Sequence, residues 1–224
     1  MAFVGDSLKN NKEQQELARL INENRRPIIL CTGNAGTGKT FAALAVALQL
    51  KAERRYGTIV YGRNPMPLGE DMGFLPGGLD EKYGPYMGPL YDNLEAIASL
   101  SNDNLNPKEL AQRIEMVPIA FLRGRSFRDT ILIIDEAQNL DLTALKAILT
   151  RIGDYSKVVL LGSMNQIDDP KQRKQTKCDF EKVIDAIQDL PYVGYVNLTK
   201  SMRSDWCVEL DGILGEIDRP KQGK

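Results

Sequence analysis

The residues best suited to chemistry stand between positions 33 and 40, in the order Gly-Asn-Ala-Gly-Thr-Gly-Lys-Thr. Their spacing fits G-x-x-x-x-G-K-[ST], the loop that wraps the phosphates of a nucleoside triphosphate. Glycines permit positive φ and bring backbone N–H groups to phosphate oxygens. Lys39 suits the β- and γ-phosphate oxygens, and the Thr40 hydroxyl suits Mg²⁺. The loop predicts binding of ATP and Mg²⁺ by Gly33, Asn34, Ala35, Gly36, Thr37, Gly38, Lys39 and Thr40.

The segments on either side of this loop provide the setting that the motif needs. Residues 27–32 are mostly apolar and predict a short buried strand. After the loop, apolar residues recur at helical spacing from Phe41 to Leu48, and a helix starting here points the positive end of its dipole at the same anion. This setting disfavours the alternative, a Gly-rich turn between ordinary elements.

Two adjacent acids, Asp135 and Glu136, follow a second apolar run at 131–134. In a parallel sheet they fall at the carboxyl edge, where ligands bind. Asp135 is suited to hold Mg²⁺ through water, and Glu136 to polarise the attacking water. The alternative is a pair of acids that only favours the start of a helix. Adjacent acids suit attack by water, so hydrolysis is favoured over a small-molecule kinase.

Two glutamines are further candidates. Gln166 follows an apolar strand at 157–161 and could sense the γ-phosphate, or it could be part of a polar turn. Gln14 could read the adenine edge, because an amide both donates and accepts, or it could cap a helix that starts near Asn11. Its neighbour Gln15 competes for the same role.

A cation is also needed to neutralise charge in the transition state, and an arginine finger is worth about 10³–10⁵ in rate. The candidates are Arg63, Arg123, Arg125 and Arg203. Arg203, which comes after the last predicted strand, is the preferred catalytic candidate. The alternative for each is a solvated surface arginine.

Composition limits the classes of protein that remain. The chain has 224 residues with 42% hydrophobic, enough for a sizeable core in one large or two small domains. A net charge of −1 provides no overall basic field for nucleic acid, and the lack of histidine excludes Ser-His-Asp catalysis and His-ligated zinc. Three cysteines without metal-ligand spacing suggest reduced thiols. No signal peptide or apolar span is visible, so we expect no membrane contact and a cytoplasmic protein, in the host cytoplasm if it comes from a phage.

The order of elements predicts an α/β fold. Apolar runs at 27–32, 58–61, 114–122, 131–134, 157–161 and 192–198 predict strands, and helices are expected after Asn11, after the phosphate loop, and at 90–100, 107–113, 142–152 and 180–190. This alternation implies a mostly parallel sheet with helices on both faces. We expect a single domain over 1–217, with a long Gly/Pro-rich loop at 64–90 and a frayed tail at 218–224.

The chain resembles the PhoH family of P-loop ATPases, which is related to the first motor domain of superfamily 1 helicases. The resemblance extends from about Gln14 to Arg203. Outside the generic ATPase motifs it rests on the following segments: 69–77, Pro85-Tyr86, 89–92, 123–126, 135–139 and 166–168. It implies a RecA-like fold, ATP hydrolysis with Mg²⁺, a ring-like homo-oligomer, hexameric by analogy, and RNA-related work.

The chain departs from the family pattern at two positions. Ser163 stands where the family usually has aspartate, which puts the strength of the sensor in doubt, and Ser204 follows Arg203 where histidine is usual. The short chain resembles a phage-type member.

Two functions follow from these observations. The first is an ATPase coupled to RNA or single-stranded DNA, and the second is an ATP-gated binding or assembly protein with incidental turnover. Basic residues at Arg123, Arg125 and Arg128, and in the run 171–177, could line a nucleic-acid path or be solvated faces. Phe74 and Tyr83 could stack on bases or pack against the domain.

Overall fold

The computed structural model describes residues 8, 11–63, 87–101, 105–122 and 124–218. Most of the predicted loop at 64–90, with Phe74 and Tyr83, lies outside these residues, as do Arg123 and positions 219–224 of the predicted tail. Of the described helices, none is long and apolar enough to cross a bilayer.

Six strands form one sheet in which every neighbouring pair is parallel. The strands are β1 (Ile28–Gly33), β2 (Thr58–Arg63), β3 (Ile114–Pro118), β4 (Thr130–Asp135), β5 (Lys157–Gly162) and β6 (Val193–Leu198). Their spatial order is β3-β2-β4-β5-β1-β6, so β5 separates the strand that leads into the phosphate loop from the strand that ends in Asp135. Because all strands run the same way, the carboxyl ends of β1, β4 and β5 meet at one edge.

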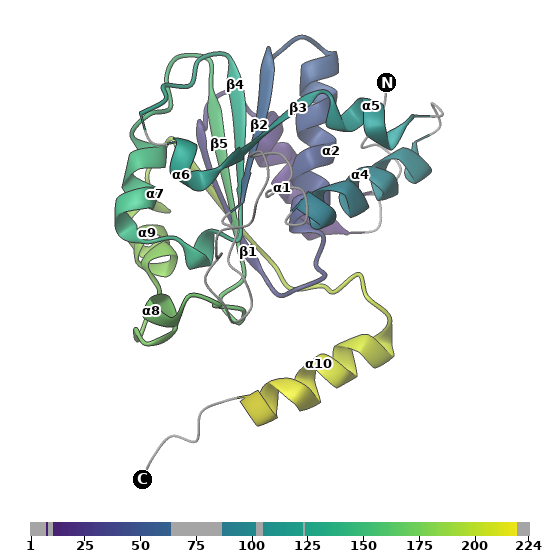
Figure 1. The fold of residues 1–224 in the computed structure, drawn as a ribbon, viewed down its shortest axis with the longest axis vertical. Coiled ribbons are helices and arrows are strands. Elements are labelled where there is room, and N and C mark those ends of the chain that lie inside the picture. The colour runs from purple at the N-terminus through teal and green to yellow at the C-terminus, as the bar shows by residue number, and fades with distance from the viewer. Residues whose placement is uncertain (1–7, 9–10, 64–86, 102–104, 123, 219–224) are drawn as a thin grey trace, which may run out of the picture.

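Helices cover both faces of this sheet (Figure 1). On one face lie α1 (Lys12–Asn22), α2 (Lys39–Ala52), α4 (Gly88–Leu100) and α5 (Pro107–Ala111); on the other lie α6 (Ile119–Leu122), α7 (Leu142–Leu149) and α9 (Asp179–Ile187). A short helix α8 (Pro170–Arg173) precedes α9, and a 3-10 turn η2 (Ala137–Asn139) follows β4. The predicted α/β fold, with a parallel sheet between two layers of helices, is confirmed.

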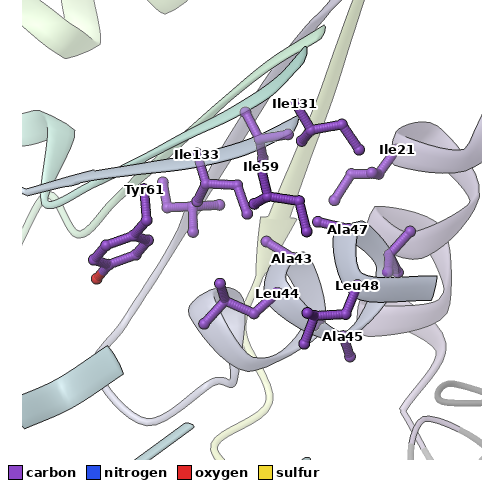
Figure 2. Packing of buried hydrophobic residues seen from close by; sticks show 14 of the residues in the cluster. Ile21, Ala43, Leu44, Ala45, Ala47, Leu48, Ile59, Tyr61, Ile131 and Ile133 are labelled. Atoms are coloured by element: carbon purple, nitrogen blue, oxygen red, sulfur yellow. The ribbon is translucent and has the colours of Figure 1, made fainter. Parts of the chain in front are cut away.

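Helix α2 is the best-buried helix of the first layer. Its buried residues face all directions, because it packs between the sheet, α1 and α4. Figure 2 shows Ala43, Leu44 and Ala47 of α2 close to Ile59 and Ile133 of the sheet. A helix enclosed in this way holds its first turn, which carries Lys39 and Thr40, in one place.

The start of α1 is fixed by its cap. The Asn11 side-chain oxygen accepts hydrogen bonds from the backbone N–H groups of Glu13 and Gln14. Leu17, Leu20 and Ile21 then bury one face of the helix, as their spacing predicts.

Several predicted boundaries are wrong. The helices expected at 107–113 and 180–190 end at Ala111 and Ile187, and Asp218, assigned to the frayed tail, is the last residue of a helix. The apolar run at 114–122 is a strand only to Pro118, after which 119–122 form helix α6. The helix expected at 142–152 ends at Leu149, because Ile152 instead pairs with Phe127 in an isolated parallel bridge. Gly88 to Leu90, assigned to the long loop, are the first turn of α4.

Helix α10 (Asp205–Asp218) is an element that the sequence reading did not identify. Figure 1 shows it beyond the sheet and its two helical layers, connected by the segment that follows β6. Large apolar side chains on it are exposed: Trp206, Val208, Leu210 and Ile213.

Candidate active site

The phosphate-binding loop connects β1 to α2 and depends on two glycines with positive φ. Gly36 has φ +71° and Gly38 has φ +80°, values that favour glycine. Both also lie against other groups: a Cβ at Gly36 would be 2.6 Å from Arg203 Nε, and a Cβ at Gly38 would collide with the Gln14 amide. Side chains at these two positions would therefore both strain the loop and displace its neighbours.

Lys39 points back into the loop. Its ammonium group donates to the carbonyl oxygens of Gly33 at 2.8 Å and Asn34 at 2.9 Å. Burial lowers the pKa of Lys39. The amine thus lies among the loop carbonyls.

Thr40 and Asp135 meet directly, from α2 and β4. The Thr40 hydroxyl donates to Asp135 Oδ2 at 3.0 Å, and the Tyr61 hydroxyl of β2 donates to the same oxygen at 2.7 Å. Burial is the main cause, and the Asp135 charge the second, that holds the pKa of Tyr61 well above its usual range. The Tyr61 hydroxyl therefore keeps its proton and remains a hydrogen-bond donor. Among the described residues no cluster of three or more His, Cys, Asp or Glu could hold a metal. One hydroxyl and one carboxylate nevertheless fit Mg²⁺, which takes few protein ligands and keeps waters and phosphate oxygens.

Glu136 follows in an unusual backbone conformation, with φ +56° and ψ +42°. This left-handed conformation costs a non-glycine residue about 1 kcal/mol or more, and such residues gather at functional sites. Its carboxylate accepts from Gln138 Nε2 at 2.5 Å and lies 3.4 Å from Arg63 Nη2. Burial, followed by the nearby Asp135 charge, raises the pKa of Glu136. The side chain is thus a half-buried carboxylate held at the same edge as Lys39 and Thr40.

Gln138 and Tyr61 are site residues that sequence reasoning missed. Gln138 lies in the segment 135–139 that carries the family resemblance, and Tyr61 is the last residue of the strand predicted at 58–61. Gln138 is fully buried, and its side-chain oxygen accepts from the Ser163 backbone N–H at 3.0 Å. The sequence signal for a role of Gln138 is its position two residues after Glu136. Its contact with Ser163 depends on the fold.

The Gln14 side chain reaches the loop, and the cap of its helix is Asn11. Its buried amide donates to the Thr37 carbonyl oxygen at 2.8 Å. Gln15 instead donates to the Leu8 carbonyl oxygen at 3.0 Å. Of the two glutamines, Gln14 is therefore the one joined to the phosphate-binding loop.

Arg203 lies over the loop of its own chain. The Met202 backbone N–H donates to the Gly36 carbonyl oxygen at 2.8 Å, which fixes this segment beside the loop. Glu13 of α1 accepts from the backbone of Thr199 and Lys200 at 2.7 and 3.0 Å and holds the segment from the other side. The preferred arginine is thus next to Gly36 in cis.

The remaining described candidates contact other groups than the phosphate-binding loop. Arg125 pairs with Glu115 of β3 at 2.7 Å and lies over the Phe127 ring. Gln166 is exposed, and its backbone carbonyl oxygen, which accepts from Gln138 at 2.8 Å, is what joins it to the acid turn. Arg63 is the described candidate arginine that contacts Glu136.

A cavity of about 310 Å³ lies beside the loop, lined in part by Asn34, Tyr195 and Asn197. Its wall includes the carboxylates of Glu181 and Asp185, which repel a phosphate. Its lining includes neither Lys39 nor Thr40. We therefore distinguish it from the site formed by Lys39, Thr40, Asp135 and Glu136.

Comparison with known proteins assigns the family. The family model described as PhoH-like protein matches residues 8–211. The chain belongs to the PhoH-like family. Its relatives include Protein PhoH2 of Bacillus subtilis (strain 168), 38% identical over 199 residues, which cover 88% of this chain and 45% of that protein. A PhoH-like protein of Mycobacterium leprae (strain TN) is 41% identical over 197 residues, with 88% and 55% covered. The chain spans about half the length of these PhoH relatives.

Solved structures include one similar in fold, the crystal structure of Pif1 helicase from Candida albicans. The two chains are 17% identical with a TM-score of 0.45, and the match covers 94% of this PhoH-like chain and 45% of the Pif1 chain. A second is a structure of two coordinating Pif1 helicases at forked DNA, with 16% identity and a TM-score of 0.41, covering 94% and 49%. The α/β assignment rests on the sheet order above.

Proposed function

We propose that this protein hydrolyses ATP with Mg²⁺ at the edge formed by β1, β4 and β5. The observation that carries the proposal is the 3.0 Å contact between the Thr40 hydroxyl and Asp135, with the Glu136 carboxylate next in the chain. Three groups with different tasks, a phosphate loop, a pair of magnesium ligands and a candidate base, are thereby close together. Family membership in PhoH supports a P-loop nucleotide site.

Each residue has a defined task in this proposal. The loop N–H groups and Lys39 bind the phosphates, and Lys39 exchanges its Gly33 and Asn34 carbonyl partners for phosphate oxygens. Thr40 and Asp135 hold Mg²⁺, which neutralises charge on the β- and γ-phosphates when bound. Glu136 orients the attacking water and takes its proton, and its raised pKa brings the carboxyl nearer the working pH of a base.

The test is ATP turnover by the purified protein, with two variants that separate binding from chemistry. Lys39→Ala should abolish nucleotide binding. Glu136→Gln should bind ATP as the wild type does and lose turnover by about 10² or more, because only the water-activating group changes. Wild-type turnover by Glu136→Gln would remove Glu136 from its assigned role.

We further propose that turnover is coupled to single-stranded RNA or DNA in a homo-oligomer, hexameric by analogy with the family. The basic residues around α8, Lys171, Arg173, Lys174 and Lys177, and Arg125 are candidates for contact with phosphates. The single-domain division, the cytoplasmic location and the phage-type assignment remain predictions.

The second candidate function, an ATP-gated assembly protein, is favoured by Ser163 in place of the usual aspartate and by the near-neutral net charge. Turnover measured with and without single-stranded RNA, and separately with single-stranded DNA, decides between the two. Stimulation that Glu136→Gln abolishes supports the motor or remodeller. Slow turnover that neither nucleic acid changes, with an oligomeric state that depends on ATP, supports the assembly protein.

A further inference from the structure

Gln138 connects the candidate base to a second segment of the site. Its Nε2 donates to Glu136 Oε2 at 2.5 Å and to the Gln166 carbonyl oxygen at 2.8 Å. Its Oε1 accepts from the Ser163 N–H at 3.0 Å. All three contacts use one planar amide, which is fully buried in the turn η2.

The segment held in this way is 163–169, which we call the β5 exit. Its far end is fixed by the neighbour of Gln138: Asn139 Oδ1 accepts from the backbone N–H groups of Asp168 at 2.8 Å and Asp169 at 3.1 Å. Its near side reaches the phosphate loop, where Asn165 donates to Asn34 Oδ1 at 2.8 Å. The β5 exit therefore touches both the loop and the acid turn.

Ser163 adds an independent observation at this point. Among the buried side-chain polar atoms of the described residues, its hydroxyl is the one left without a hydrogen-bond partner. A buried hydroxyl without a partner costs free energy unless water or a ligand supplies one. It stands at the carboxyl end of β5, between the strands that carry the phosphate loop and Asp135.

We propose that Gln138 is the positioning residue for Glu136 and makes the position of that carboxylate depend on the β5 exit. The inference rests on the proposed ATPase function. Gln138 occupies Oε2, so Oε1 is the oxygen that accepts the proton of the attacking water; its contact with Arg63 is long, at 3.4 Å. A shift of the β5 exit moves the amide, because Ser163 and Gln166 hold it, and the amide moves the carboxylate.

A buried amide could instead serve stability alone, and a matched variant separates the two roles. Gln138→Leu removes the contacts and keeps the volume. Gln172→Leu is the control, because the Gln172 amide is also buried and bonded at both ends, to Asp179 at 3.1 and 2.8 Å, away from Glu136. Gln138→Met is a second variant that replaces the first if it fails to fold.

We expect Gln138→Leu to lower kcat about 10- to 100-fold, with KM and the Kd for a non-hydrolysable ATP analogue within about threefold of wild type. Gln172→Leu should lose a similar amount of thermal stability and keep kcat within about twofold. Equal kcat in the Gln138 and Gln172 variants would overturn the inference.

A double-mutant cycle gives the readout that a structural role would not produce. If Gln138 acts through Glu136, adding Gln138→Leu to Glu136→Gln should lower the residual turnover no further. If the turnover loss of the double variant were instead the product of the losses of the two single variants, the inference would be overturned and the proposed function would stand. Full turnover by the single variant Glu136→Gln would instead refute the assignment of Glu136 as the base. The two failures can therefore be told apart.

Discussion

The Gln14 side-chain amide donates to the Thr37 carbonyl oxygen at 2.8 Å and so connects helix α1 to the phosphate-binding loop. The contact is buried and joins residues 23 positions apart in the chain. Gly38 is part of the same contact, because a Cβ there would collide with the amide. The loop is thus shaped from outside as well as by its own glycines.

Gln14→Ala should therefore weaken binding of ATP and GTP by the same factor, about 5- to 10-fold, since it leaves the Thr37 carbonyl without a donor. Calorimetric titration with each nucleotide measures this. Gln15→Ala, whose amide bonds Leu8, is the control and should bind both nucleotides as the wild type does. A loss restricted to ATP would instead assign Gln14 to reading adenine.

Arg203 lies against Gly36 of its own chain, which predicts that it acts in cis. Arg203→Ala should lower turnover about 10³-fold if this guanidinium neutralises the transition state. Mixing Arg203→Ala with Lys39→Ala should restore no turnover, because each chain then lacks one group of its own site. Arg19→Ala, a surface arginine paired with Glu16, is the control for loss of an arginine. Recovery of turnover on mixing would show that the arginine is supplied by a neighbouring subunit.

Ser163→Ala should leave the free protein as stable as the wild type or more so, because the deleted hydroxyl has no partner. It should also weaken stabilisation by ATP and Mg²⁺ by about 1 kcal/mol if the ligand or its water supplies that partner. Ser156→Ala is the matched control: its hydroxyl accepts from the Thr130 N–H at 3.1 Å, so the free protein should lose stability. Thermal unfolding with and without nucleotide measures both, and equal behaviour of the two variants would contradict the prediction.

The sequence predicts those elements that are determined by a local pattern of residues. Strand β1, the loop and α2 are contiguous, and the loop motif, the apolar run and the helical spacing all agree. The same holds for β4 with Asp135 and Glu136. Each of these predictions uses one short stretch of chain, 27–48 for the first and 131–136 for the second.

What the sequence does not predict depends on contacts between distant residues. The apolar run at 114–122 has no feature that marks where β3 ends and α6 begins, because both are buried. The Gln138 amide bonds the Ser163 N–H, 25 positions away, and the Lys157 ammonium group donates to the Leu20 carbonyl oxygen, 137 positions away. The large apolar side chains described on helix α10 are exposed, so they do not form the buried stripe by which an amphipathic helix is recognised.

Trp206 is the single tryptophan of the chain and is 63% exposed on α10. Its fluorescence should therefore already be that of a water-exposed indole in the folded protein and change little on unfolding in urea. Far-UV circular dichroism of the same samples should show the loss of the helices and serves as the control. A large red shift on unfolding would mean that Trp206 is buried in solution.

Lys157 begins β5 at the edge opposite the site and is 1% exposed. Its ammonium group donates to the carbonyl oxygens of Leu20 at 3.2 Å and Glu23 at 2.5 Å, at the end of α1. Burial, with a further contribution from Arg55, lowers the pKa of Lys157 to about 8. The contacts satisfy the amine, yet its charge remains costly in this position.

This lowered pKa predicts that stability depends on pH in a defined direction. Between pH 8 and 10.5 the unfolded chain binds a proton on Lys157 that the folded protein does not, so the free energy of unfolding rises with pH across this window. The gain is about 3 kcal/mol for this one group. Because other groups also titrate, the measurement is urea unfolding of wild type and Lys157→Met at several pH values. From pH 8 to 10.5 the free energy of unfolding of the wild type should rise relative to that of Lys157→Met. If the two free energies instead changed in parallel with pH, the folded protein would keep Lys157 charged.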